Sequence, residues 1–195
     1  INWKATARKE GLMVNNYTDE RSQQIYCLIN KGRVMKMPFN GMTLLDQAIN
    51  ASLVLSNVAL VKQDNAGVIT FEKNLDTFLL ADKKPMQMNL ILESLYRQKT
   101  DYLESDFEKL FSVIRNSVTN RSLLILFTNF ESLESLQREM SALKKIAKYH
   151  LLLVVFFENT ELKSLIEGNA SSLEAIYIKT IAEKFAFEKR LMVKE

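Results

Sequence analysis

The chain has 195 residues, of which 47% are hydrophobic and 25% are charged, and its formal net charge at pH 7 is +3. This composition is typical of a globular domain with a sizeable core, and it excludes a disordered chain, a coiled coil and a repeat array. So small a charge gives no indication of nucleic-acid binding, for which a strongly basic face is typical.

The sequence shows no signal peptide, and its longest apolar run, residues 151–157, has the length of a strand rather than of a membrane span. The single cysteine, Cys27, excludes an internal disulfide and is consistent with a reducing compartment. Because the chain opens on Ile1 in the middle of a pattern, we interpret it as a piece of a longer protein. We divide it into an amino-terminal segment, residues 1–20, and one domain, residues 21–195.

Apolar strands alternate with amphipathic helices along the domain. The predicted strands are short apolar runs at residues 24–29, 66–71, 75–80, 123–127 and 151–157. The predicted helices share apolar residues at helical spacing and cover residues 43–60, 86–96, 105–118, 133–146, 160–168 and 173–191. This order predicts a doubly wound, three-layer α/β fold. Its sheet is mostly parallel, with one antiparallel edge strand and helices on both faces.

Two of the helix starts carry the pattern of a capping box. Thr43 precedes Asp46 by three residues, and Ser105 precedes Glu108 by three residues. We therefore expect Thr43 and Ser105 to accept hydrogen bonds from helix-start amides. The helix at 43–60 is apolar nearly all round, which predicts that it is heavily buried.

Right-handed crossovers place the loops after Ile29, Phe127 and Phe157 at one edge of the sheet, where open α/β proteins bind ligands. The first loop, residues 30–33, has one glycine and lacks Gly-Lys-Ser/Thr, which excludes a phosphate-binding loop. It also lacks the three spaced glycines of a dinucleotide-binding fingerprint. Asn30 stands where a dehalogenase-type phosphotransferase has its aspartate nucleophile, and an amide cannot serve in that role.

The other reactive side chains favour structural roles. Cys27 lies in a predicted buried strand with no basic neighbour, so we interpret it as a core residue rather than a reactive thiol. His150 is the only histidine, and no Gly-x-Ser-x-Gly motif accompanies it, so we interpret it as structural or exposed rather than as a catalytic base. Asp106 and Glu108 can reach the ligand edge of the sheet, but their position at a helix start already explains them.

Several segments resemble one known family. Residues 1–8, Ile-Asn-Trp-Lys-Ala-Thr-Ala-Arg, look like its signature Asp/Asn-Trp-Lys-x-Ser/Thr-Ala-Arg. Residues 64–71, Asp-x-x-Gly-Val-Ile-x-Phe, look like its hairpin start, and residues 126–129, Leu-Phe-Thr-Asn, also follow its pattern. The family is the bacterial "domain of unknown function 58", whose core domain is similar to the von Willebrand factor A domain.

Domains of this family often carry a metal-ion-dependent adhesion site. It uses Asp-x-Ser-x-Ser in the first loop, a threonine in the second and an aspartate in the third. The residues that the resemblance places at these positions are Asn30, Gly32, Val34, Ser105 and Asn129. Both carboxylates are replaced by amides and both first-loop hydroxyls are missing. The resemblance therefore implies a degenerate site that binds Mg²⁺ weakly or not at all, and it implies no other cofactor.

The resemblance also implies a function, because genes of this family typically accompany MoxR-type AAA+ ATPases. We expect a non-catalytic adaptor domain that binds such an ATPase or another protein, and neither nucleic acid nor a membrane. The expected location is the cytoplasm, with the full-length parent anchored to the inner membrane. The expected partner-binding rim consists of first-loop residues: Lys31, Arg33, Met35, Lys36 and Phe39.

The alternative is a metal-dependent hydrolase or phosphotransferase that uses Asp106, Glu104 or Asp101. The sequence leaves open the identity of the partner, the pathway and the oligomeric state.

Overall fold

The computed structural model describes residues 8, 22–39, 41–157, 166 and 173–193. Its centre is a five-stranded sheet whose strands are β1 (Gln24–Asn30), β4 (Asn65–Phe71), β5 (Leu75–Asp82), β6 (Leu123–Phe127) and β7 (Leu151–Val155). The order in the sheet is β5-β4-β1-β6-β7, and only β5 runs antiparallel to its neighbour. The predicted α/β class, with a mostly parallel sheet and one antiparallel edge strand, is confirmed.

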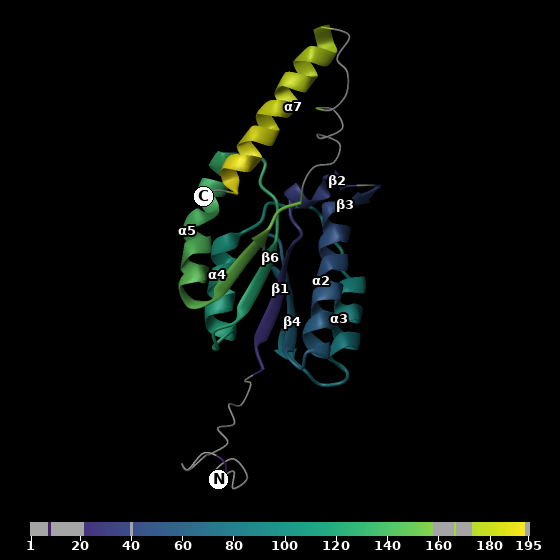
Figure 1. Cartoon of the computed structure of the whole chain (residues 1–195), viewed down its shortest axis with the longest axis vertical. Helices are drawn as coiled ribbons and strands as arrows, with labels where there is room; N and C mark the ends of the chain where they lie inside the picture. The colour runs from purple at the N-terminus through teal and green to yellow at the C-terminus, as the bar shows by residue number, and fades with distance from the viewer. Residues whose placement is uncertain (1–7, 9–21, 40, 158–165, 167–172, 194–195) are drawn as a thin grey trace.

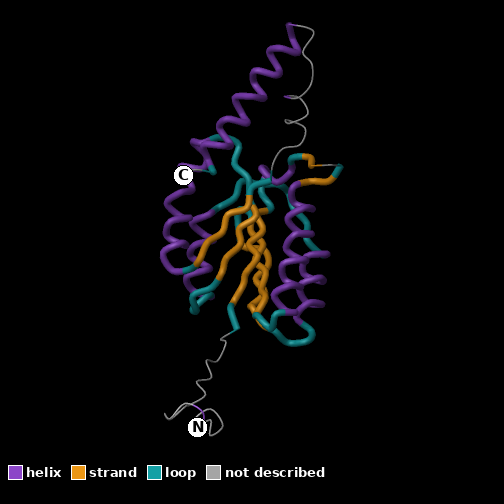
Figure 2. The backbone as a smooth tube through the Cα atoms, viewed as in Figure 1, coloured by secondary structure: helices purple, strands orange, loops and turns teal. Residues whose placement is uncertain are grey.

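Helices cover both faces of the sheet (Figures 1 and 2). On one face lie α2 (Leu44–Val61) and α3 (Gln87–Tyr96), and on the other lie α4 (Phe107–Ser117) and α5 (Leu133–Tyr149). The last helix, α7 (Leu173–Met192), contacts α5 and extends beyond the sheet in Figure 1. The expected helix at 160–168 and the segment 1–20 lie outside the described residues, apart from residues 8 and 166.

Three short elements follow β1 and were not predicted. They are the 3₁₀ helix η1 (Arg33–Lys36) and a two-stranded ribbon of β2 (Pro38–Phe39) and β3 (Met42–Thr43). The ribbon leads directly into α2, whose capping box between Thr43 and Asp46 is present as predicted.

The core consists of two apolar clusters, one on each face of the sheet. Along β1 the side chains alternate, so that Tyr26 and Leu28 pack with α4 and α5 while Cys27 and Ile29 pack with α2. This double burial explains the continuous apolar run of the strand. Cys27 is buried, which confirms it as a core residue, and this burial raises the pKa of its thiol to about 11.

Helix α2 is less buried than its sequence predicts, because only one of its faces packs on β1, β4 and α3. Val54 and Val61 are 63% and 73% exposed. By length and composition this helix is the one described helix that qualifies as a membrane span, a test that a core helix also passes.

Candidate functional site

Three loops meet at the carboxyl edge of the sheet. Asn30 ends β1, Thr128 follows β6, and Ser105 lies just before α4. A hydrogen bond of 2.9 Å from Asn30 Nδ2 to Thr128 Oγ1 joins the first two loops, as right-handed crossovers predict. Residues 158–165, which come directly after Phe157, lie outside the described part of the chain.

The side chain of Asn30 is the centre of this meeting point. Its Oδ1 accepts hydrogen bonds from the Ser105 hydroxyl at 2.5 Å and from the Gly32 amide at 2.7 Å. Asn30 is buried, and both ends of its amide have protein partners. Thr128, one of these partners, was not among the predicted site residues. Its position directly after an apolar strand, next to Asn129, could have indicated that it belongs to the site.

Gly32 permits the approach of Ser105. A β-carbon on residue 32 would overlap the Ser105 hydroxyl oxygen and would lie only 2.9 Å from the carbonyl oxygen of Leu103. The backbone φ of Gly32 is −70°, which any residue can adopt, so the requirement for glycine here is one of space. Any side chain at this position must displace Ser105.

The predicted capping role of Ser105 is wrong. Asp106 is the residue that caps α4, because its carboxylate accepts a hydrogen bond of 2.9 Å from the amide of Lys109. The cap of α4 lies one residue later than predicted, which frees the Ser105 hydroxyl for Asn30. Glu108 pairs with Lys145 at 2.8 Å rather than reaching back to the helix start.

Asn129 and Val34 complete the predicted set. Asn129 is buried, and its Nδ2 donates to the sulfur of Met37 at 3.4 Å. Its Oδ1 accepts no hydrogen bond from any described residue. Val34 is half-buried and offers only an apolar surface. The structure therefore brings all five predicted positions to one place, of which four line a common pocket: Asn30, Val34, Ser105 and Asn129.

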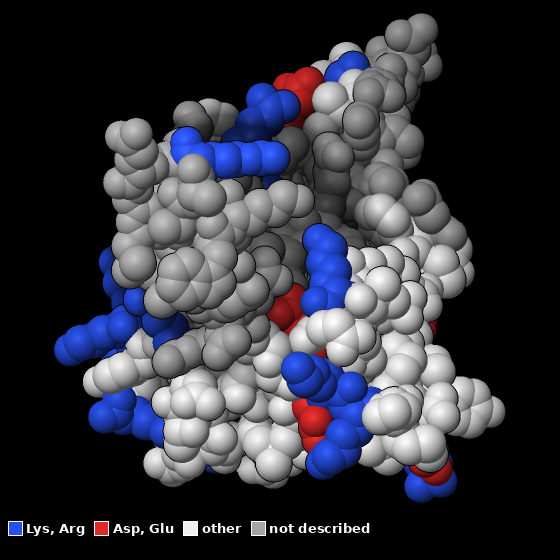
Figure 3. Space-filling model, turned by 60° about the horizontal axis from the view of Figure 1, so that its bottom comes forward, with Lys and Arg blue, Asp and Glu red and all other residues white. Residues whose placement is uncertain are grey.

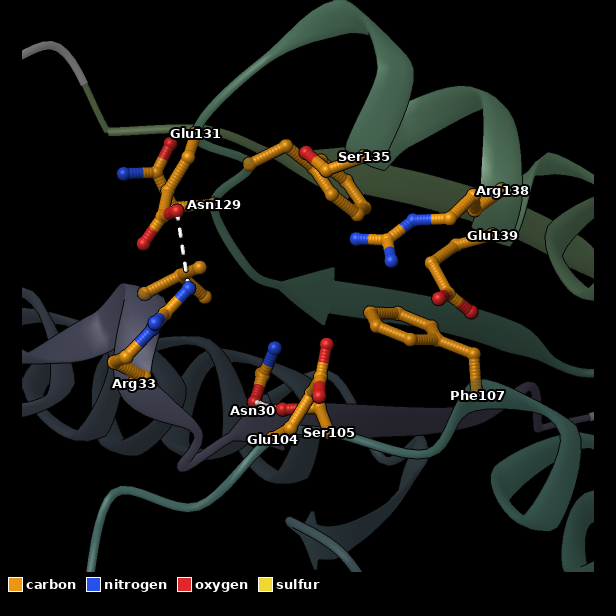
Figure 4. Close-up of a pocket in the computed structure, with 12 residues that line it drawn as sticks. Asn30, Arg33, Glu104, Ser105, Phe107, Asn129, Glu131, Ser135, Arg138 and Glu139 are labelled. Atoms are coloured by element: carbon orange, nitrogen blue, oxygen red, sulfur yellow. Dashed lines mark hydrogen bonds and ion pairs between the residues drawn. The ribbon is translucent and has the colours of Figure 1, made fainter.

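This pocket has a volume of about 80 Å³ (Figure 4). Its charged lining residues are two arginines and three glutamates: Arg33, Arg138, Glu104, Glu131 and Glu139. Arg33 pairs with Glu131 at 3.1 Å. Burial raises the pKa of Glu139; Arg138 acts against this rise, while nearby carboxylates, including Glu104, add to it. The surroundings of Glu139 therefore disfavour its negative charge.

The expected partner-binding rim is only partly correct. Lys31 is buried, and its ammonium donates to Asp76 Oδ2 and to the carbonyl oxygen of Lys99, each at 2.7 Å. Met35 is also buried, in the cluster beneath α2. These two residues are excluded from a surface, because the ammonium of Lys31 is held in a partly buried ion pair and Met35 fills the core.

The remaining three rim residues are accessible. Arg33 and Lys36 are exposed, while Phe39 is half-buried with its ring 6.1 Å from the ring of Phe157. Lys36 lies 5.6 Å from the ring of Tyr102, so the first loop also contacts the loop before α4.

The residues proposed for catalysis are dispersed or occupied. Asp106 caps α4, Glu104 lines the pocket, and Asp101 is exposed. The described part of the chain holds no group of three or more His, Cys, Asp or Glu residues suited to a metal ion. His150 is buried just before β7, its Nδ1 accepts from the amide of Ser122, and burial lowers its pKa.

Comparison with known families decides the identity of the domain. The family model described as "Protein of unknown function DUF58" matches residues 1–168. The chain belongs to the DUF58 family. The resemblance based on the Trp-Lys-x-Thr-Ala-Arg segment and the strand pattern is thereby confirmed.

One solved structure supports the fold of this DUF58 domain. An aerotolerance-related membrane protein from Bacteroides fragilis matches with a TM-score of 0.51 and 11% identity, over 68% of this chain and 66% of that one. The chain thus spans slightly less than two thirds of that protein's length. BatB from Bacteroides thetaiotaomicron matches with a TM-score of 0.47 and 12% identity, over 89% and 100%.

The VWA domain of SpRpn10 matches with a TM-score of 0.39 and 9% identity, over 76% of this chain and 96% of that one. No curated protein matches the chain. The family match, the sheet order and the single antiparallel strand together describe a DUF58 domain built on a mostly parallel α/β sheet.

Proposed function

We propose that this DUF58 domain is a non-catalytic adaptor that binds a partner protein without a tightly held metal ion. The observation that carries the proposal is the hydrogen bonding of Asn30, whose oxygen already accepts from Ser105 and Gly32. A metal site of this family would have a carboxylate at position 30. Here the neutral amide of Asn30 stands in its place and stabilises the meeting point of three loops.

The chemistry of the available oxygens supports weak or absent Mg²⁺ binding. A divalent cation is held chiefly by carboxylates, whose charge offsets the cost of removing its water. Here Asn30 and Asn129 are neutral, Gly32 has no side chain, and Val34 is apolar. These residues do not fit a tightly bound Mg²⁺, and no other cofactor is proposed.

The accessible part of the rim, Arg33, Lys36 and Phe39, is the surface that we propose for the partner. Its two exposed cations and one half-buried ring suit an amphipathic segment with acidic residues, since aromatic and arginine side chains dominate many interfaces. The buried Lys31 supports this surface by tying the first loop to β5 and to the loop before α4.

We propose that the partner is a MoxR-type AAA+ ATPase, on the strength of the family resemblance. We also propose a cytoplasmic location and a membrane-anchored parent protein; that one similar structure is an aerotolerance-related membrane protein is consistent with such a parent. Nucleic acid is not a proposed partner, because basic side chains on the face seen in Figure 3 form separate groups with acidic residues among them.

The alternative, a metal-dependent hydrolase or phosphotransferase using Asp106, has less support. The carboxylate of Asp106 already caps α4 and lies 3.6 Å from the ammonium of Lys109. A nucleophile or metal ligand at this position would have to give up the cap.

Co-purification of the domain with the AAA+ ATPase encoded beside it tests the proposal. The domain is expected to associate, and Arg33→Glu and Phe39→Ala are each expected to weaken the association at least tenfold. The matched control is Arg97→Glu, which reverses an equally exposed charge directly after α3, away from the rim, and is expected to leave the association unchanged. Absence of association, or equal loss in all three variants, would contradict the proposal.

A further inference from the structure

Strand β7 lies at one edge of the sheet, and its outer side has no neighbouring strand in the described part of the chain. The amide of Leu151 donates to the carbonyl oxygen of Ser122, so this residue bonds towards β6. Because the bonding direction alternates along a strand, the backbone N–H and C=O groups of Leu152 and Val154 point outward. No described residue bonds to them. Such a row of free donors and acceptors is a template for another strand.

The two edges of the sheet differ in their protection against such pairing. The other edge strand, β5, carries Asp76 and Asp82 and has two shifts in its register with β4. Charged side chains and irregularities of this kind hinder edge-to-edge pairing. Strand β7 consists only of leucine and valine, and it pairs with β6 without a shift. The β7 edge therefore favours a further strand, and the β5 edge does not.

Two side chains of β7 are also far more exposed than their neighbours in the sheet. Leu151 and Leu153 are 61% and 51% exposed, whereas Ile125, which lies beside Leu153 on β6, is 5% exposed. The helices on this face, α2 and α3, pack on β1, β4 and β5 and leave these leucines open (Figure 1). Apolar side chains beside a free backbone edge suit a partner strand that is itself apolar.

We propose that β7 of a second copy of this chain pairs with β7 in antiparallel orientation, about a two-fold axis at Leu153. In this register Leu152 of each copy stands opposite Val154 of the other, and each of these two pairs exchanges two hydrogen bonds. All outward backbone groups within the strand then have partners. Leu153 faces Leu153 and Leu151 faces Val155, so every facing pair of side chains is apolar.

This self-complementary register is the reason for assigning the edge to a second copy. A closed two-fold contact uses the same patch twice, so one uncharged apolar edge satisfies both sides. A single strand pair is smaller than a standard interface of about 1,600 Å², so we expect a weak dimer with a Kd of roughly tens of micromolar. The inference goes beyond the adaptor function, whose rim follows β1, two strands away from this edge.

Sedimentation equilibrium of the 195-residue chain across the micromolar range tests the inference. A reversible monomer–dimer equilibrium is expected. Leu153→Lys places two ammonium groups opposite each other on the two-fold axis and is expected to weaken the dimer roughly fivefold or more. Leu80→Lys changes a similarly exposed leucine on β5 and is the matched control, expected to leave the equilibrium unchanged. Thermal unfolding of both variants separates loss of pairing from loss of folding.

A cysteine at the two-fold axis tests the register. The Cα atoms of a non-hydrogen-bonded antiparallel pair lie about 4.5 Å apart, within reach of a disulfide. Leu153→Cys is therefore expected to form a disulfide between copies under mild oxidation. Leu151→Cys is not, because its two thiols would lie about 13 Å apart along the strands. The parent chain, whose only thiol is the buried Cys27, is the blank.

Three outcomes would overturn the inference. They are a chain that stays monomeric across the range, a dimer that Leu153→Lys leaves intact, and equal cross-linking through Leu151→Cys and Leu153→Cys. A monomeric chain whose association with the ATPase is lost in Leu153→Lys would assign the edge to a strand of that partner instead. The adaptor function is measured separately through the rim variants Arg33→Glu and Phe39→Ala, so either proposal can fail without the other.

Discussion

The hydroxyl of Ser105 occupies the space that a side chain on residue 32 would need. These two residues are 73 positions apart in the sequence, and glycine at one allows the other to reach Asn30. The three loops can therefore pack this closely only because residue 32 has no side chain. Restoring a hydroxyl there by substitution would displace Ser105 rather than add a ligand.

Substitution of Gly32 by alanine is expected to destabilise the domain by about 1–3 kcal/mol, the usual cost of overpacking. The φ of −70° alone would make alanine favourable by about 0.4–1 kcal/mol, through the unfolded chain. The clash with Ser105 and the Leu103 carbonyl is expected to exceed that gain. Urea denaturation measures the free energy of unfolding.

Ser105→Ala provides the control for this clash. Alone it removes one hydrogen bond and is expected to cost about 1 kcal/mol. Combined with Gly32→Ala it is expected to cost less than the sum of the two single changes, because the overlapping oxygen is gone. Strict additivity, or a Gly32→Ala variant as stable as the parent, would contradict the packing described for this site.

Substitution of Lys31 by methionine keeps the aliphatic stem and removes the buried ammonium. It breaks the contacts with Asp76 and the Lys99 carbonyl and is expected to cost about 1.5–3 kcal/mol, the value of hydrogen bonds to charged groups. Arg33→Met is the matched control, since its exposed pair with Glu131 is worth about 0–1 kcal/mol. Equal effects in chemical denaturation would show that Lys31 is not the anchor of the first loop.

The stability of the domain is expected to depend on His150 in mildly acidic solution. Burial lowers the folded pKa of His150 below its ordinary value of about 6.5, so the unfolded chain binds the proton more readily. The stabilisation is fully present above pH 6.5. It falls away as the pH drops towards the folded pKa, with a slope of at most about 1.4 kcal/mol per pH unit.

This dependence is measured as the free energy of unfolding at pH 7.5 and at pH 5.5. Because the chain has a single histidine, His150→Gln is expected to flatten the difference between the two values. A difference of the same size in the parent and the variant would assign the pH dependence to other groups.

The strands around the site were predictable because burial on both faces leaves a continuous apolar run. The run ending at Ile29 and the run ending at Phe127 placed Asn30 and Thr128 at one sheet edge. The approach of Ser105 to Asn30 was not predictable from local pattern, because Ser105 and Asp106 are both competent caps. Only the family resemblance pointed Ser105 towards that edge.

The burial of Lys31 could not be predicted from the sequence, for a different reason. A lysine in a polar loop is usually exposed, and its burial here depends on Asp76, 45 residues away on an antiparallel edge strand. The sequence also overestimated the burial of α2, because no described element covers the apolar outer face of this helix. Local periodicity gives the apolar face of a helix but not the extent of the sheet beneath it.

Calorimetric titration of the domain with Mg²⁺ tests the central claim most directly, because Asn30, Gly32 and Ser105 form a site closed by their own hydrogen bonds. We expect no saturable heat across the millimolar range, and the same trace for the parent and for Asn30→Ala. Micromolar affinity in the parent that is lost in Asn30→Ala and in Ser105→Ala would contradict the account.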